Sequence, residues 1–171
     1  MILIQIVAWT IDTIQRSLYR IYTGYFIHFI SIIMTPDTPY GKIIRHEVET
    51  PIIFQDDTLL IFLDYRPVSR GHALVLPIEP IDHLDDCPPE LYAQLFAAVQ
   101  KISKAIKQEL NPKRVGIVVS GFEVPHAHIH VLPMYTGKEM KSEHDRDDSP
   151  TVPASELQDL AAKLAARYKE L

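Results

Sequence analysis

Three histidines alternate with apolar residues in one short stretch, residues 126–132 (HAHIHVL). Side chains of a β-strand point alternately to opposite faces, so in an extended chain His126, His128 and His130 share one face. Neighbouring imidazoles then start about 6.5–7 Å apart, because each residue rises about 3.3 Å. The stretch therefore predicts a strand, placed over residues 124–132, with one face in the core and the other in a site.

Burying three imidazoles on one face for structural reasons alone would cost free energy, because each buried ring has two nitrogens that need hydrogen-bond partners. One small reaction centre would contact the middle ring, His128, while His126 and His130 orient it, bind phosphate oxygens or move protons. Neutral imidazole is a good nucleophile near pH 7. Zinc binding is the competing interpretation, with His72 or Asp64 as a further ligand. No acidic residue lies within the stretch, which makes a metal site the less favoured choice.

Hydrophobic periodicity around this stretch predicts a small sheet and one main helix. The expected strands are residues 52–54, 59–63, 72–77, 115–120 and 124–132, and the expected helices are residues 40–45, 88–111 and 155–168. Five short strands with one main helix inserted before the last two indicate an α+β fold with an antiparallel five-stranded sheet. The C-terminal helix is expected to pack on this domain or on a second subunit.

Charge and cysteine content narrow the functional classes. The formal net charge is -5 and no Lys/Arg block stands out, so the sequence shows no basic patch of the kind that binds nucleic acid. Cys87 is the single cysteine, which excludes a disulfide within the chain and a cysteine-based zinc site. We interpret Cys87 as structural, and a reducing cytoplasm as the simplest location.

The chain divides into three regions by composition. Residues 35–135 form the expected domain, and residues 136–171 form a charged linker with the C-terminal helix. Residues 1–34 are an apolar extension, whose uncharged part is shorter than the roughly 20 residues of a membrane-spanning helix. The extension is either a membrane-associating or partner-binding helix, or the product of a start placed upstream of Met34. The second interpretation is favoured, and membrane contact is expected only if residues 1–34 are genuine.

Residues 126–132 resemble the signature of the histidine-triad (HIT) family, in which three histidines alternate with apolar residues. Further segments resemble that family in the same order. They are residues 40–45 (YGKIIR) for its N-terminal segment, 54–57 and 62–64 for its first two strands, and 66–77 (RPVSRGHALVLP) for the following loop and strand. The resemblance covers roughly residues 35–135.

This resemblance implies the HIT α+β fold, usually a homodimer whose two sheets join into one. It implies a nucleotide hydrolase or nucleotidyltransferase that acts on the α-phosphate of an AMP-like substrate, with no cofactor and no obligatory metal. His128 would be the nucleophile and would form a covalent nucleotidyl-histidine. Its other nitrogen would donate to a main-chain carbonyl near His126. His72 matches an additional family histidine near the leaving group.

The resemblance also assigns the nucleotide contacts. Asp64 matches the acid that accepts hydrogen bonds from ribose hydroxyls. The expected base-lining residues are Ile43, Ile44, Phe62 and Leu63. Ser120, Glu123 and Val124 complete the expected substrate contacts.

The turn before the triad departs from the family pattern. Relatives often have Gly-Gln-Ser or Gly-Gln-Thr where this chain has Gly121-Phe122-Glu123. A carboxylate repels phosphate, so Glu123 points away, binds a leaving-group amine or pairs with a cation. The sequence does not determine the leaving group, and three substrate classes fit it: adenosine phosphoramidates, aminoacyl adenylates and dinucleoside polyphosphates. The alternatives to an enzyme of this type are a non-catalytic nucleotide-binding module and a metal-dependent hydrolase. The cysteines that bind zinc in some HIT proteins are absent, so no structural metal is expected.

Overall fold

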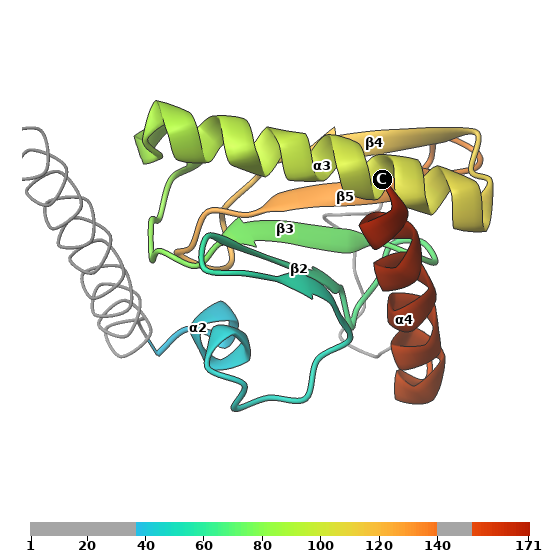
Figure 1. Cartoon of the computed structure of the whole chain (residues 1–171), viewed down its shortest axis with the longest axis horizontal. Helices are drawn as coiled ribbons and strands as arrows, with labels where there is room; N and C mark the ends of the chain where they lie inside the picture. The colour runs from blue at the N-terminus through green and yellow to red at the C-terminus, as the bar shows by residue number, and fades with distance from the viewer. Residues whose placement is uncertain (1–36, 140–151) are drawn as a thin grey trace, which may run out of the picture. The chain divides into compact units, whose positions relative to one another are not determined.

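The computed structural model describes residues 37–139 and 152–171, so the expected extension at 1–34 lies outside the described residues. Five antiparallel strands form one sheet in the order β1-β2-β3-β5-β4 (Figure 1). The strands are β1 (Ile52–Gln55), β2 (Leu59–Leu63), β3 (Ala73–Pro77), β4 (Arg114–Val118) and β5 (Ile129–Met134). The helices are α2 (Pro39–Ile44), α3 (Pro89–Leu110) and α4 (Ala154–Glu170), with a short 3₁₀ turn at Leu84–Asp86. This is the α+β architecture that the hydrophobic periodicity predicts.

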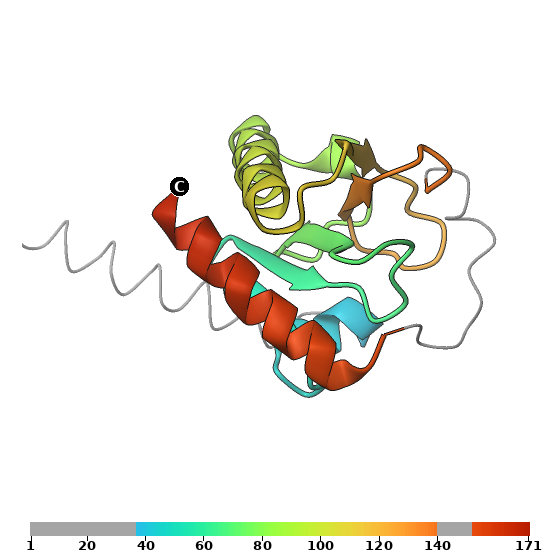
Figure 2. The same ribbon diagram turned by 90° about the vertical axis from the view of Figure 1, so that its right-hand side faces the viewer.

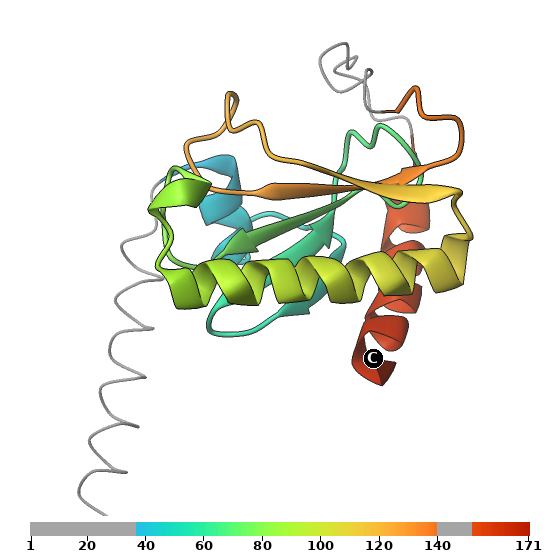
Figure 3. The same cartoon turned by 90° about the horizontal axis from the view of Figure 1, so that it is seen from above.

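Side-chain alternation gives the sheet two apolar faces. On one face Ile61, Val75 and Ile129 pack with α3 and α4 into the larger core. On the other face, Phe62 and Leu74 pack with residues of α2 in a smaller cluster. Figure 3 shows α3 along one side of the sheet and α2 on the other. Because both faces are covered, the central strands β2 and β3 are buried along their whole length.

Helix α3 begins and ends as its sequence predicts. Pro89 occupies its first turn, where a missing N–H costs nothing. It ends at Asn111, whose φ of 47° is left-handed, a conformation in which asparagine often terminates a helix. Within residues 37–139 and 152–171, no helix has both the length and the hydropathy of a membrane span.

Helix α4 packs on this domain, against α3 and β1 (Figure 2). Leu157, Leu160 and Leu164 are buried in the larger core, and the Tyr168 ring lies 5.0 Å from that of Phe54. The helix begins at Ala154 with Pro153 as its N-cap, one residue before the expected start, and no side chain caps it. The apolar spacing therefore placed the start of the helix to within one residue.

The histidine-bearing strand starts later than expected. Residues 124–132 were predicted to be one strand, but β5 begins at Ile129, so His126 and His128 precede it. The β3–β5 pairing ends at Val75–Ile129. Before that point the Ala127 N–H donates to the carbonyl of Ile81, beyond the end of β3, at 2.7 Å. Pro125 has no N–H to donate to a neighbouring strand. The His126 N–H donates locally, to the carbonyl of Val124 at 2.8 Å.

Candidate active site

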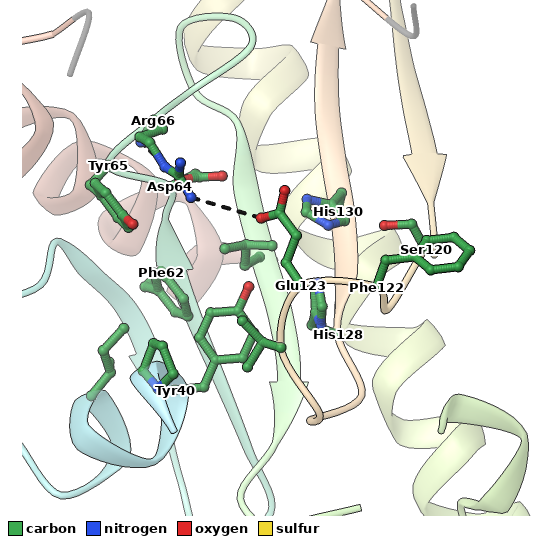
Figure 4. Close-up of a pocket in the computed structure, with 14 residues that line it drawn as sticks. Tyr40, Phe62, Asp64, Tyr65, Arg66, Ser120, Phe122, Glu123, His128 and His130 are labelled. Atoms are coloured by element: carbon green, nitrogen blue, oxygen red, sulfur yellow. Dashed lines mark hydrogen bonds and ion pairs between the residues drawn. The ribbon is translucent and has the colours of Figure 1, made fainter. Parts of the chain in front are cut away.

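A pocket of about 260 Å³ opens on the α2 side of the sheet, beside the histidines (Figure 4). It is lined by residues from α2, the ends of β2 and β3, the turn before the triad, and β5. They are Pro39, Tyr40, Ile43, Phe62, Asp64, Tyr65, Arg66, Leu74, Ser120, Phe122, Glu123, Val124, His128 and His130. Phe62 and Leu74 share this face because they are register partners on β2 and β3.

The His128 ring is held by the backbone of His126, two residues earlier. Its Nδ1 lies 2.7 Å from the main-chain oxygen of His126. A carbonyl only accepts, so Nδ1 carries the proton and the lone pair is on Nε2. The Tyr40 ring packs edge-on against the imidazole, with centroids 5.0 Å apart. His128 is 4% exposed yet lines the pocket, so the ring is reached from the pocket and is shielded from bulk water.

His126 lies behind the pocket and is fully buried. Its Nε2 donates to the carbonyl of Pro77 at 2.8 Å, at the end of β3. Burial lowers the pKa of His126, while the Pro77 carbonyl opposes that shift. Its buried Nδ1 has no hydrogen-bond partner among the described residues. The hydrogen bond from His126 to Pro77 therefore ties the triad segment to β3.

His72 and His130 form a hydrogen bond in which donor and acceptor can be assigned. Nε2 of His72 lies 3.0 Å from Nδ1 of His130, and both rings are buried. The Val68 N–H donates to Nδ1 of His72 at 3.3 Å, which leaves the His72 proton on Nε2. His72 then donates to His130, and the proton of neutral His130 is on Nε2. The His128 and His130 rings are therefore in opposite tautomers. Nε2 of His128 offers a lone pair to the pocket, and Nε2 of His130 offers an N–H.

Asp64 follows β2 and is 5% exposed. One carboxylate oxygen accepts the Arg66 N–H at 2.8 Å, and the other lies 3.5 Å from Nδ1 of His72. That second contact becomes an ion pair when His72 is protonated. Asp64, His72 and His130 also place three ligand atoms within 4.8 Å of one another. A metal there would have to replace the hydrogen bond between the two imidazoles.

The turn before the triad closes one side of the pocket. Glu123 points toward Arg66 across the opening, at 3.8 Å (Figure 4). Of the three expectations for Glu123, pairing with a cation is the one observed. Ser120 and Val124 also line the pocket. Phe122 is 90% exposed, so it is not held by packing.

Not every expected contact reaches the pocket. Ile43 and Phe62 line it, whereas Ile44 is buried in the cluster behind it. Leu63 faces the larger core on the opposite side of the sheet. Adjacent residues of a strand point to opposite faces, so Phe62 faces the pocket beside the histidines and Leu63 faces away from it.

Sequence reasoning missed several lining residues. Leu74 was recoverable, because it shares its face with His72 by alternation in the predicted strand. Tyr40 lies one helical turn before Ile43 and Ile44, a spacing that also places it on their face. Tyr65 and Arg66 follow the expected contact Asp64 directly. Their approach depends on the loop after β2, for which the sequence carries no comparable signal.

An antiparallel five-stranded sheet, with alternate histidines leading into its fifth strand and the middle ring fixed by a main-chain carbonyl beside a pocket, defines the histidine-triad class of α+β domains. The chain belongs to the HIT domain family, whose model matches residues 45–137.

Two curated relatives and one solved structure illustrate the similarity. "Protein hit" of Bacillus subtilis (strain 168) is 34% identical over 101 residues, which are 56% of this chain and 70% of that protein. "Adenylylsulfatase HINT3" of Arabidopsis thaliana is 32% identical over 57% of this chain and 52% of its own length. The crystal structure of a Hit-like protein involved in cell-cycle regulation from Bartonella henselae superposes with a TM-score of 0.66. It is 26% identical, over 77% of this chain and 96% of that one.

Proposed function

We propose that the protein is a nucleotide hydrolase or nucleotidyltransferase that acts on the α-phosphate of an AMP-like substrate through a covalent nucleotidyl-His128. The observation that carries the proposal is the 2.7 Å contact between Nδ1 of His128 and the His126 carbonyl. This contact directs the lone pair of Nε2 to the ring's other edge, beside the N–H of His130. A relative named adenylylsulfatase adds support, since that activity also concerns an adenylyl group.

In the first step, Nε2 of His128 attacks phosphorus. The N–P bond forms, the bond from phosphorus to the leaving group breaks, and its electron pair goes with the leaving group. His130 supplies the proton for the leaving group from Nε2. A proton moves from Nε2 of His72 to Nδ1 of His130 along their 3.0 Å contact. The pair enters the step with one extra proton on Nδ1 of His72, which then donates to Asp64 at 3.5 Å and no longer accepts the Val68 N–H.

In the second step, water attacks the nucleotidyl-histidine. The N–P bond breaks, its electron pair returns to Nε2 of His128, and the nucleoside monophosphate is released. The proton of the water goes to Nε2 of His130, and the Nδ1 proton of His130 moves back to His72. An alcohol or phosphate that replaced water would make the same reaction a nucleotidyl transfer.

The nucleoside would lie between α2 and the sheet. Ile43 and Phe62 offer an apolar surface for the base, and the Tyr40 ring extends it toward His128. Asp64 lines the same pocket with oxygens suited to ribose hydroxyls. Adenine is the expected base because the adenylyl group is the one named in a relative.

Trapping with a nucleotide labelled at the α-phosphate tests the proposal. Wild-type protein, quenched during turnover of adenosine phosphoramidate or a dinucleoside polyphosphate, should carry covalent label. His128→Ala should carry none. His83→Ala is the matched control, because its side chain is 71% exposed and lies outside the pocket. Label on His128→Ala, or none on wild type despite nucleotide binding, would contradict the proposal. The second outcome would favour a non-catalytic nucleotide-binding module.

A further inference from the structure

Arg66 is a fixed cation at the mouth of the pocket. Its backbone N–H is bound to Asp64 at 2.8 Å, and Pro67 restricts the chain that follows. Its guanidinium carbon lies 5.3 Å from the centre of the Tyr65 ring, a cation–π distance. The side chain is 25% exposed. The contact with Tyr65 therefore holds the charge at the mouth of the pocket before any ligand arrives.

Glu123 is a far less restrained partner. It lies in a turn without regular structure, next to the 90% exposed Phe122. Its side chain is 69% exposed, and the ion pair with Arg66 spans 3.8 Å, near the upper limit for such a contact. Exposed ion pairs of this kind contribute little, since water and salt compete with them. An anion of higher charge can replace the carboxylate at small cost.

We infer that Arg66 binds a second anionic group of the nucleotide, beyond the α-phosphate, and that Glu123 covers Arg66 until that group displaces it. This deepens the proposed function and rests on it. A phosphate or sulfate suits the site because it offers several oxygens to the planar guanidinium, which binds such groups by two parallel hydrogen bonds. A carboxylate at 3.8 Å makes no hydrogen bond of that quality.

The second anionic group has two chemical sources. It is either the leaving group attached to the α-phosphate or a phosphate on the ribose. The position of Arg66, between Asp64 and the turn with Glu123, is compatible with both, since Asp64 is the expected ribose contact. The shared requirement is one additional negative charge within reach of the guanidinium.

Binding measurements with three nucleotides test the inference without depending on turnover. AMP is the reference, ADP adds a phosphate on the leaving-group side, and adenosine 3′,5′-bisphosphate adds one on the ribose. The measured quantity is the ratio of the Kd of AMP to the Kd of each of the other two, by calorimetry at pH 7.5. Product analysis of the same samples checks that the nucleotides are intact.

Arg66→Gln should lower one of the two ratios about tenfold, and Glu123→Gln should raise the same ratio about threefold. The ratio that responds identifies the leaving-group side or the ribose side as the source. Arg66→Gln with both ratios within about twofold of wild type would overturn the inference. A lowered ratio in Glu123→Gln would do so as well.

A double variant separates displacement from simple repulsion. If Glu123 acts by covering Arg66, adding Glu123→Gln to Arg66→Gln should change the ratio by less than about twofold. An undiminished effect in the double variant would mean that Glu123 only repels anions, and would overturn its covering role. Lys104→Gln and Asp159→Asn are the controls. Each removes one exposed charge from α3 or α4, outside the pocket, and should leave both ratios unchanged.

Failure of the proposed function gives a different pattern. If wild type forms no nucleotidyl-histidine but the ratios respond as expected, the catalytic proposal is wrong and the Arg66 site stands. If label forms on His128 but the ratios do not respond, only the inference about Arg66 falls. A protein that binds none of the three nucleotides contradicts both.

Discussion

Nδ1 of His128 lies 2.7 Å from the main-chain oxygen of His126, two residues earlier in the chain. The contact is local, so the segment that carries the proposed nucleophile also fixes its tautomer. His130 has the opposite arrangement, because its Nδ1 accepts a hydrogen bond from Nε2 of His72 at 3.0 Å. Two neighbouring rings on one segment therefore present different chemistry to the same pocket, a lone pair and a proton donor.

We expect nitrogen NMR to detect these opposite tautomers. In ¹⁵N-histidine-labelled protein at pH 8, Nε2 of His128 should resonate in the range of unprotonated imidazole nitrogen, and Nε2 of His130 in the protonated range. His72→Asn removes the donor to His130 and should alter the His130 signals while leaving His128 as it was. Protonated Nε2 on His128 in the wild type would contradict its assignment as nucleophile.

Acid sensitivity should arise in part from His126. Burial lowers its pKa below the ordinary histidine value of 6.5, which the unfolded chain retains. As the pH falls through that value the unfolded chain binds the proton first, so stability decreases toward acid until the folded pKa is reached. His126→Gln keeps a donor for Pro77 but cannot titrate. Urea unfolding at pH 7.5 and 5.5 should show a smaller loss of stability in the variant; equal losses would contradict this.

Much of the fold followed from residue alternation and helical spacing. Val75 and Ile129 face the larger core, and Phe62 faces the pocket, as alternation along extended segments requires. The same rule excludes Leu63 from the pocket, which the family resemblance alone did not. Within a single element, local geometry is enough to separate the two faces.

What the sequence did not predict depends on contacts between distant segments. The start of β5 is set by the Ala127 N–H bonding to Ile81, a contact that no local pattern encodes. The pairing of Arg66 with Glu123 joins residues from two loops. Both depend on how the chain returns to the sheet after β3 and β4, which only tertiary packing decides.

Helix α4 should contribute to the stability of the whole domain. Leu164 has 0% exposure within the larger core. Leu164→Ala leaves a cavity and should lower the free energy of unfolding by about 2–5 kcal/mol, measured by urea denaturation. Lys163→Ala, at the neighbouring exposed position, should stay within about 0.5 kcal/mol. An effect of Leu164→Ala as small as that of the control would mean that α4 is not part of the cooperative unit.

The homodimer expected from the family resemblance has a candidate surface in β4. It is an edge strand of the sheet, and Ile117 on it is 46% exposed. Edge strands with exposed apolar residues are prone to pair with another strand. If two sheets join there, Ile117→Lys should shift the protein toward monomer in sedimentation velocity. Val48→Lys, at a 48% exposed apolar residue outside the strands, should not. A wild-type monomer would contradict the expectation.

The turn that positions His72 depends on Gly71. Its φ of +89° disfavours any residue with a Cβ, and an added Cβ would collide with Cδ1 of Leu110. Gly71→Ala should therefore lower the free energy of unfolding by about 1–3 kcal/mol. Gly121→Ala is the matched control: its φ is +72° but nothing lies within 4 Å, so it isolates the backbone cost, about 1 kcal/mol. If the collision matters, Gly71→Ala combined with Leu110→Ala should cost less than the sum of the two single changes. Strict additivity would assign the whole effect to the backbone.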